Sequence, residues 1–302
     1  MRPIKLFLVL LLAATASSVA GAAGQKSFAT PEEAARQLTA AARSGDSKAL
    51  VDILGADARA IITSGDPVDD RNSRERFAKA YDEANKLERS GDAMAVLSVG
   101  KDAWPFPIPI VKDAAGWRFD TKQGKDEILN RRIGRNERHA ILAALAYVDA
   151  QREYYARNPQ GDKLPQYAQK FLSASGKRDG LYWRARAAEQ PSPLGPVFAA
   201  ARAEGYGKDS SGKPYPYHGY FYRILKGQGP EAPGGAYDYV AQGRMIGGFA
   251  LIATPAEYGN SGIMTFIVNH VGAVYEKDLG PESARIARTI STFNPDKTWK
   301  AL

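Results

Sequence analysis

The sequence predicts an α+β protein in which a long helix joins two sheet-containing parts. Apolar residues recur at three- and four-residue spacing early in the chain and again over 126–157, as in amphipathic helices. Alternating apolar positions and turn residues dominate 93–119 and most of the chain after 217, as in strands. The 302 residues, 44% of them apolar, suffice for two hydrophobic cores. We expect N-terminal helices with a curled antiparallel sheet, followed by a long helix packed on a second antiparallel sheet.

Residues 1–22 have the composition of a cleavable signal peptide. Arg2 and Lys5 form a basic start, 6–14 are mostly apolar, and 20–22 are small. The apolar run is shorter than a transmembrane helix, and no stretch of about eighteen apolar residues follows it. The lack of cysteine also removes the attachment residue of a lipoprotein. We expect a periplasmic or secreted protein without a transmembrane segment after cleavage.

Composition excludes several kinds of chemistry. Without cysteine there are no disulfides, thiolate nucleophiles, iron–sulfur clusters or cysteine-ligated zinc. The formal net charge is +8, and removal of Arg2 and Lys5 leaves 8 − 2 = +6. The densest basic stretch, over 122–138, lacks interleaved aromatics, so we interpret it as a solvated helix face and expect no nucleic-acid binding. Attraction to an anionic membrane or envelope polymer is the alternative.

The first folded part is expected to begin with three helices. Thr30 provides a capping hydroxyl, Pro31 suits the first helical position and Glu33 completes a capping box, so a helix should extend to about residue 43. Gly45 and Asp46 separate it from a second helix that ends at residue 55. Apolar spacing from Phe77 to Leu87 predicts a third helix.

Two strands, over 93–99 and 117–119, should follow these helices, with a turn at 113–116. Between them, prolines alternate with apolar residues in the segment WPFPIPI, 104–110. If this segment is extended, the apolar side chains share one face and the prolines remove amide donors along one edge only. We therefore predict an edge strand or a lid.

The second half is expected to begin with a helix from 126 to about 157, ended by Asn158 and Pro159, with Gly134 as a candidate bend. Its predicted buried side consists of Ile128, Leu129, Ile133, Ile141, Leu142, Leu145 and Val148. Short helices are expected at 167–172 and 197–204, strands at 217–225, 245–253, 262–269 and 273–277, and a closing helix over 281–290. The predicted units are therefore the signal peptide 1–22, a cone-like domain 23–122, a helical connector 123–206 and an antiparallel domain 207–302.

Six short runs, in this order, resemble an uncharacterised family of bacterial exported proteins that carries only a domain-of-unknown-function label. They are WPFPIP (104–109), NRRIGRNE (130–137), DGLYW (179–183), SPLGP (192–196), YHGYFYR (217–223) and PAEYGNSG (255–262). The resemblance covers nearly the whole chain after the leader. It implies location and organisation but no activity.

Two further resemblances concern shape. Residues 28–121 resemble the cone-shaped domains of the nuclear-transport-factor-two and cystatin-like class, and 262–275 resembles the carboxy-terminal sheet of type II secretion pseudopilins, on which a long helix packs. The pilin maturation signal is missing, because the apolar segment precedes the predicted cleavage point instead of following it. We therefore expect a pilin-like shape without fibre assembly.

Candidate catalytic and metal-binding residues are few. His139, His218 and His270 are not linked by any short metal-binding spacing, so we expect no metal and no cofactor. The segment around Ser261 is the one most similar to a nucleophile elbow, but the glycines on either side of Ser261 suit a turn between strands. Candidate carboxylate pairs are Asp238 with Glu257 and Glu257 with Asp278. The glycine-rich segments 227–230 and 234–235 and the polar segment 209–212 are interpreted as loops, and the catalytic residues, if any, stay unknown.

Aromatic residues provide the leading hypothesis. Amphipathic rings at alternate strand positions line one surface, unless loops cover them. We therefore expect a non-catalytic envelope protein that binds a protein or polymer partner through Tyr217, His218, Tyr220, Tyr222, Tyr239 and Tyr258. The alternative is a hydrolase of an envelope polymer, whose site lies in the N-terminal cone or between domains and is lined by Trp104, Trp117, Asp69 and Asp70.

Overall fold

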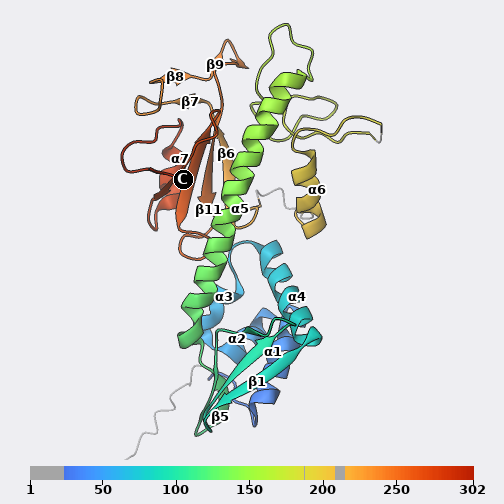
Figure 1. Cartoon of the computed structure of the whole chain (residues 1–302), viewed down its shortest axis with the longest axis vertical. Helices are drawn as coiled ribbons and strands as arrows, with labels where there is room; N and C mark the ends of the chain where they lie inside the picture. Colours follow the sequence, from blue (N-terminus) through green and yellow to red (C-terminus); the bar gives the residue numbers. More distant parts are fainter. Residues whose placement is uncertain (1–23, 187, 208–214) are drawn as a thin grey trace, which may run out of the picture.

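The computed structural model describes residues 24–302 except 187 and 208–214, so the predicted leader and the polar turn expected at 209–212 lie outside the described residues. The fold is α+β, as predicted. One hydrophobic core is built from residues between Phe28 and Phe119, and a second from residues between Ala140 and Phe293. Figure 1 shows the two parts at opposite ends of the molecule, with the long helix α5 extending from one to the other.

Helices α1 (Pro31–Ser44) and α2 (Ser47–Leu54) form where the capping residues predicted them. The Thr30 hydroxyl accepts a hydrogen bond from the Glu33 amide at 3.1 Å, and Gly45 ends α1 with a φ of 69°. Asp46 caps α2. The chain continues through the short helices η1 (Ala56–Ala58) and α3 (Arg59–Ile62) to α4 (Pro67–Glu83), which Asp66 caps.

The first sheet is antiparallel, in the order β1-β2-β4-β5, with β3 also paired to β2. Its strands are β1 (Asn85–Ser90), β2 (Met94–Val99), β3 (Trp104–Pro105), β4 (Ile110–Asp113) and β5 (Gly116–Phe119). The prediction that Leu87 continues the third helix is wrong. Leu87 pairs with Leu97 in the β1–β2 hairpin, because Lys86 and Glu88 beside it give that segment the alternation of a strand.

Helix α5 (Thr121–Arg157) is continuous through Gly134 and ends at Asn158, which has a φ of 43°. Its buried positions in the second core include Ala140, Ala144, Tyr147 and Val148. The prediction that Leu142 and Leu145 are buried is wrong, since they are 56% and 38% exposed. The helix instead turns its small alanines toward the sheet, where they allow close packing.

The connector between α5 and the second sheet is mostly irregular. The short helix predicted at 167–172 is absent from these described residues, because Tyr167 and Leu172 form isolated bridges with Met245 and Tyr182 instead. The helix predicted at 197–204 is present as α6 (Gly195–Glu204).

The second sheet is antiparallel in the order β14-β13-β12-β11-β6. Its strands are β6 (Tyr220–Leu225), β11 (Ala250–Pro255), β12 (Met264–Asn269), β13 (Val274–Asp278) and β14 (Lys300–Ala301). Two smaller pairs are β7 (Gly227–Gln228) with β8 (Tyr237–Asp238), and β9 (Val240–Ala241) with β10 (Arg244–Met245). Helix α5 packs on β11 and β12, and α7 (Ser283–Thr289) on β11. All six β11 residues are buried, so both faces of this strand are covered.

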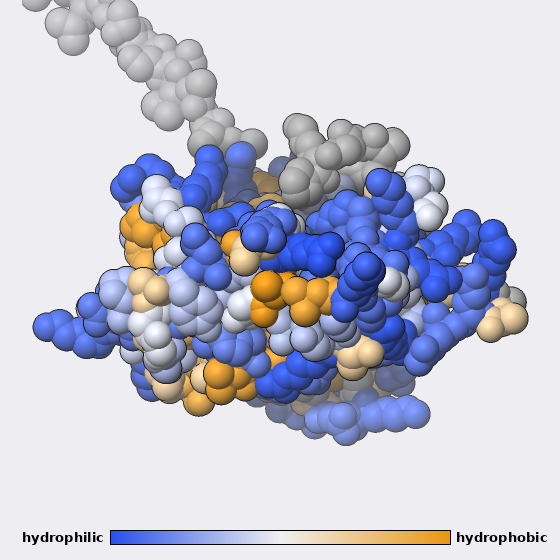
Figure 2. Space-filling view, turned by 90° about the horizontal axis from the view of Figure 1, so that it is seen from above, coloured by the Kyte–Doolittle hydropathy of each residue, from blue (hydrophilic) through white to orange (hydrophobic). Residues whose placement is uncertain are grey.

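The visible surface is mainly hydrophilic. From above the view of Figure 1, apolar residues form small separate patches among hydrophilic ones (Figure 2). Within residues 24–302, the two gaps aside, no helix has both the length and the hydropathy to cross a membrane.

Candidate functional site

A cavity of about 450 Å³ opens in the N-terminal part, between helices α1 to α5 and the first sheet. This volume is in the range of small-molecule pockets. Its inner wall is apolar and comes from residues far apart in the chain: Leu38, Ala42, Leu50, Leu54, Ile61, Ile62, Phe77, Ala80, Val99, Trp104, Phe106 and Ile128. The cavity can therefore enclose an apolar group.

Five arginines line the same cavity: Arg74 and Arg76 from α4, and Arg131, Arg132 and Arg135 from α5. The side chains of Arg76, Arg131 and Arg135 are 40% to 58% exposed, so this edge of the cavity faces water. The Nε atom of Arg74 is buried and has no hydrogen-bond partner within the described part of the chain. The arginine edge is thus suited to an anion.

Carboxylates balance these arginines only in part. Asp69 lies 2.9 Å from Arg135 and 3.4 Å from Arg76, and Glu127 pairs with Arg131 along α5. Asp70 is the only carboxylate among the described lining residues. The described lining itself holds five arginines and one carboxylate, whereas Glu257 acts on Arg132 and Glu204 on Arg76 from outside the lining.

Arg132 links the cavity to the second part of the molecule. Its guanidinium donates to the carbonyls of Ala60 and Ile61 in α3 and to the Asn260 side chain. Burial lowers the pKa of Arg132, and the nearby Asp70 carboxylate opposes this shift. Cation binding at the end of a short helix satisfies carbonyls that the helix leaves unpaired.

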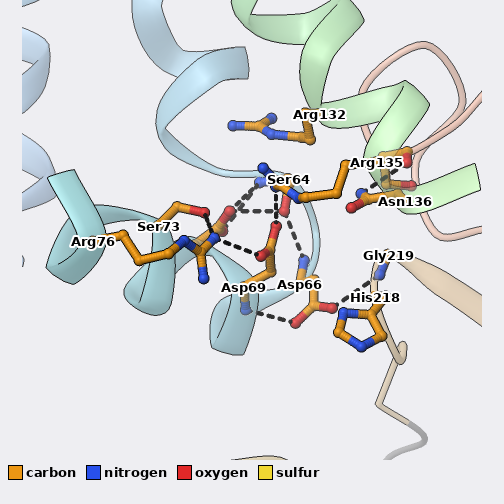
Figure 3. A network of polar contacts seen from close by, with 12 residues as sticks. Ser64, Asp66, Asp69, Ser73, Arg76, Arg132, Arg135, Asn136, His218 and Gly219 are labelled. Carbon is orange, nitrogen blue, oxygen red and sulfur yellow. Dashed lines mark hydrogen bonds and ion pairs between the residues drawn. The ribbon is translucent and has the colours of Figure 1, made fainter. Parts of the chain in front are cut away.

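Asp66 forms a junction between α4 and the turn before β6. One carboxylate oxygen accepts the amides of Val68 and Asp69, which caps α4. The other accepts the Tyr206 hydroxyl at 2.8 Å and the Gly219 amide at 2.9 Å. Burial raises the pKa of Asp66, and these hydrogen bonds oppose the shift. Figure 3 shows the side chains converging from α4, α5 and the turn.

Two further contacts make this junction tight. Asp70 accepts hydrogen bonds from the amide and the hydroxyl of Ser64, and burial raises its pKa. A Cβ atom on Gly219 would lie 2.6 Å from the Asn136 side-chain nitrogen, and the φ of Gly219 is 75°. The turn therefore requires glycine at this position.

A histidine pair lies beside the junction. The ring centroids of His139 and His218 are 4.2 Å apart, and His218 Nε2 lies 3.5 Å from a Glu204 carboxylate oxygen. Burial, with a contribution from His139, lowers the pKa of His218 to about 4. Burial also lowers the pKa of His139. Both rings are therefore neutral at pH 7.

The comparisons with known proteins agree with the resemblance of the six runs. Residues 25–302 match a family described as "Protein of unknown function (DUF2950)". The chain belongs to this family. No curated protein and no solved structure matches it. Because the match spans both cores, the cavity and the junction both lie within the DUF2950 region.

The DUF2950 fold buries part of the predicted tyrosine surface. Tyr220 and Tyr239 are 0% exposed, so the expectation that they face a partner is wrong. Their rings fill the second core, and their hydroxyls donate to the Met264 carbonyl and the Gln228 side chain. Tyr217, His218, Tyr222 and Tyr258 are partly exposed.

These four residues do not share one strand face. The Tyr217 ring lies 4.3 Å from His218 and 6.4 Å from Tyr222, which places this group beside the junction. Tyr258 instead donates to Asp278 at 3.2 Å.

The four residues of the alternative cone site lie in or near the first core. Asp70 and Trp104 line the cavity, Asp69 contacts two of its arginines, and Trp117 is buried in the core. Two of the remaining candidates are held by local contacts in this DUF2950 chain. Ser261 bonds the backbone of Glu257, and the His270 ring contacts Tyr239 and Phe249. Across the described ranges, no three His, Asp or Glu residues form a group that could hold a metal.

Sequence reasoning did not identify the arginine edge as a site. Arg131, Arg132 and Arg135 were interpreted as a solvated helix face, whereas the structure places them opposite Arg74 and Arg76 of α4. The NRRIGRNE run was a usable signal, because three arginines within five positions share one side of a helix. The partner helix could not be inferred without the fold.

Proposed function

We propose that this DUF2950 protein is an exported, non-catalytic binding protein of the cell envelope, and that its ligand is an amphipathic anion. The observation that carries the proposal is an apolar cavity of about 450 Å³ with five arginines along one edge. An apolar chain would fill the interior, and a carboxylate or phosphate group would lie at the guanidinium groups.

Both ends of such a ligand contribute favourably to the free energy of binding. Removing apolar surface from water contributes about 25 cal/mol per Å², and the inner wall offers only apolar side chains. An arginine binds carboxylate or phosphate through paired, charge-assisted hydrogen bonds. Arg74 has an unpaired Nε, and the described lining holds five arginines and one carboxylate, which favours an anion at this edge.

The cavity supports binding better than catalysis. Hydrolysis needs a nucleophile or an activated water beside a base. None of the described residues that line the cavity is a histidine, and both oxygens of its one carboxylate, Asp70, accept hydrogen bonds from Ser64. The hydrolase alternative therefore has no acid–base pair at this cavity.

The location and the wider role are parts of the same proposal. The basic and apolar leader over 1–22 supports export to the periplasm. The long helix on an antiparallel sheet supports a pilin-like organisation of the second part. Binding of a protein or polymer partner through Tyr217, Tyr222 and Tyr258 stays a prediction.

Calorimetry with three probes tests the ligand class. Dodecyl phosphate below its micelle concentration should bind, whereas dodecanol and inorganic phosphate should each bind at least about tenfold more weakly, because each lacks one of the two groups. Equal affinity for dodecanol and dodecyl phosphate would contradict the role of the arginines.

Two exposed arginines on α5 provide a matched pair of variants. Arg131 lines the cavity, whereas Arg138, two turns further along the helix, does not. Arg131→Gln should weaken dodecyl phosphate binding about fivefold to tenfold, and Arg138→Gln should leave it unchanged. Ala80→Phe, which places a ring in the cavity, should abolish binding of the alkyl chain. An equal loss for Arg131→Gln and Arg138→Gln would show that only general charge matters.

A further inference from the structure

The geometry points to a second binding site, beside the first turn of α6, for a carboxylate carried on an apolar group. The site is a cavity of about 300 Å³ in the connector, and its lining includes Tyr182, Trp183, Arg184, Pro191, Ser192 and Gly195. It shares no lining residue with the larger cavity. It is therefore independent of the proposed function.

Two lining residues carry polar atoms without partners. Ser192 is 3% exposed, and among the described residues its hydroxyl has no hydrogen-bond partner. The buried indole nitrogen of Trp183 likewise has none there. A buried polar group without a hydrogen bond destabilises the protein, and an acceptor supplied by a ligand would remove this cost. The indole is a donor only, so the ligand must accept hydrogen bonds.

The N-terminus of α6 lies at the same place. A Cβ atom on Gly195, the first residue of α6, would lie 3.4 Å from the Ser192 hydroxyl. Leu194 precedes the helix and provides no side-chain cap. The Gly195 amide donates to the Ser192 carbonyl at 2.7 Å and Pro196 has no amide hydrogen, so the helix dipole is what favours negative charge at this end of α6. An anionic acceptor is therefore favoured over a neutral one.

Two positive side chains lie at or beside the cavity. Arg184 lines it and is exposed, and Arg202 lies over the Tyr182 ring with 5.5 Å between guanidinium carbon and ring centroid. Within the described chain, neither of these arginines is ion-paired with a carboxylate. An incoming carboxylate would therefore meet unpaired cations.

The remaining walls are apolar and fixed by packing. The Tyr182 ring stacks on Phe198 with centroids 4.3 Å apart, and Arg178 lies over Trp183. Pro191, Pro196, Ala185 and Ala199 also line the cavity. The walls thus suit an aromatic or aliphatic group attached to the carboxylate. Such a group occurs both in small organic acids and at the carboxyl terminus of a peptide.

Nuclear magnetic resonance of the Trp183 indole N–H tests this site. Trp183→Phe identifies the signal among those of the four tryptophans. The probes are phenylacetate, phenylacetamide, the peptide Gly-Gly-Phe and its carboxyl-terminal amide. We expect a saturable shift of the Trp183 signal with phenylacetate, with Gly-Gly-Phe or with both, and at least fivefold weaker binding of the matching amide. Response to one acid alone identifies the source as a small acid or a peptide terminus. No shift with either acid, or equal affinity for acid and amide, overturns the proposal.

Substitutions separate this site from general effects. Ser192→Ala should weaken binding of the acid about fivefold, the equivalent of one hydrogen bond. Thr265→Val is the matched control, because the Thr265 hydroxyl is also buried and unpaired but lies in β12, outside the cavity lining. If Ser192→Ala does not fold, the exposed Arg184→Gln replaces it and should also weaken binding. Unchanged affinity in both site variants overturns the proposal.

Discussion

The ring of His139, on α5, meets the ring of His218 edge to face, with centroids 4.2 Å apart. Around the pair lie Arg135 and Arg76, which lower the pKa of His218, and Asp69, which raises it. Burial outweighs Asp69, so His218 stays neutral in the folded protein down to a pH of about 4. The packing of α5 against the turn before β6, beside the Asp66 junction, therefore depends on uncharged rings.

Stability should fall as the pH is lowered from about 6.5 to about 4. An unfolded histidine takes up a proton near pH 6.5, whereas folded His218 resists it, so acid favours the unfolded chain by up to about 3 kcal/mol. Asp66 and Asp70 act in the opposite direction at the acid end, because their pKa values are raised on folding. Urea unfolding at several pH values measures the net slope.

His218→Asn is the control for this pH dependence. Asparagine tolerates the φ of 49° at this position and does not titrate. The free energy of unfolding of this variant should depend less on pH. The dependence that remains should come from His139 and His270, because burial also lowers their pKa values. An unchanged slope would assign the pH dependence to other groups.

Replacement of Asp66 by alanine should reduce the free energy of unfolding by about 2–4 kcal/mol. The change removes the cap of α4 together with the acceptor for Tyr206 and Gly219. Asp46→Ala, which removes only the cap of α2, should cost about 1 kcal/mol. Chemical denaturation compares the two. Equal losses would mean that the junction bonds contribute nothing.

Two glycines of α5 should respond oppositely to alanine. A Cβ atom on Gly134 meets nothing within 4 Å, so Gly134→Ala should stabilise the helix by about 0.5–1 kcal/mol. A Cβ atom on Gly124 would overlap the Pro107 carbonyl oxygen, so Gly124→Ala should cost about 1–3 kcal/mol. Thermal unfolding of both variants decides the matter, and stabilisation at Gly124 would disprove the close contact with Pro107.

Tyr220→Ala should destabilise the protein by about 3–5 kcal/mol, because its ring is fully buried beside Phe266. Tyr237→Ala should cost less than about 1 kcal/mol, since Tyr237 is 40% exposed. Denaturant midpoints test both values. A partner lost by Tyr220→Ala would thus report unfolding and not a binding surface. If Tyr220→Ala hardly changes the free energy of unfolding, Tyr220 would again be a candidate for partner binding.

The elements that could be predicted from the sequence are those fixed by local signals. The capping box of α1 and the Gly45-Asp46 break before α2 depend on neighbours within a few residues, so they could be predicted. The start of α4 at Pro67 was missed, because Asp66 and Pro67 were interpreted as a loop before a helix that begins at Phe77. The orientation of α5 could not be predicted in the same way. Leu142 and Leu145 suggest a buried side, but the face with Ala140 and Ala144 packs on the sheet, and only the shape of the sheet decides between them.

The candidate site could be predicted from the sequence even less well than the orientation of α5. Arg132 is charged and was therefore expected in water, yet carbonyls of α3 and the Asn260 side chain bury it. These partners are 71, 72 and 128 positions away in the sequence. The cavity wall likewise comes from five helices and a sheet. Contacts over such separations depend on tertiary packing and leave no periodic pattern in the chain.

The unbroken course of α5 has a mechanical consequence. At 1.5 Å per residue, its 37 residues measure about 55 Å, and the same rod carries Ile128 at one core and Val148 at the other. The segment that joins the two cores along α5 is therefore helical throughout and contains no flexible linker. After a proteolytic cut near Gly134, only non-covalent contacts such as those of Asp66 with Tyr206 and Gly219 and of Arg132 with Asn260 would hold the two parts together.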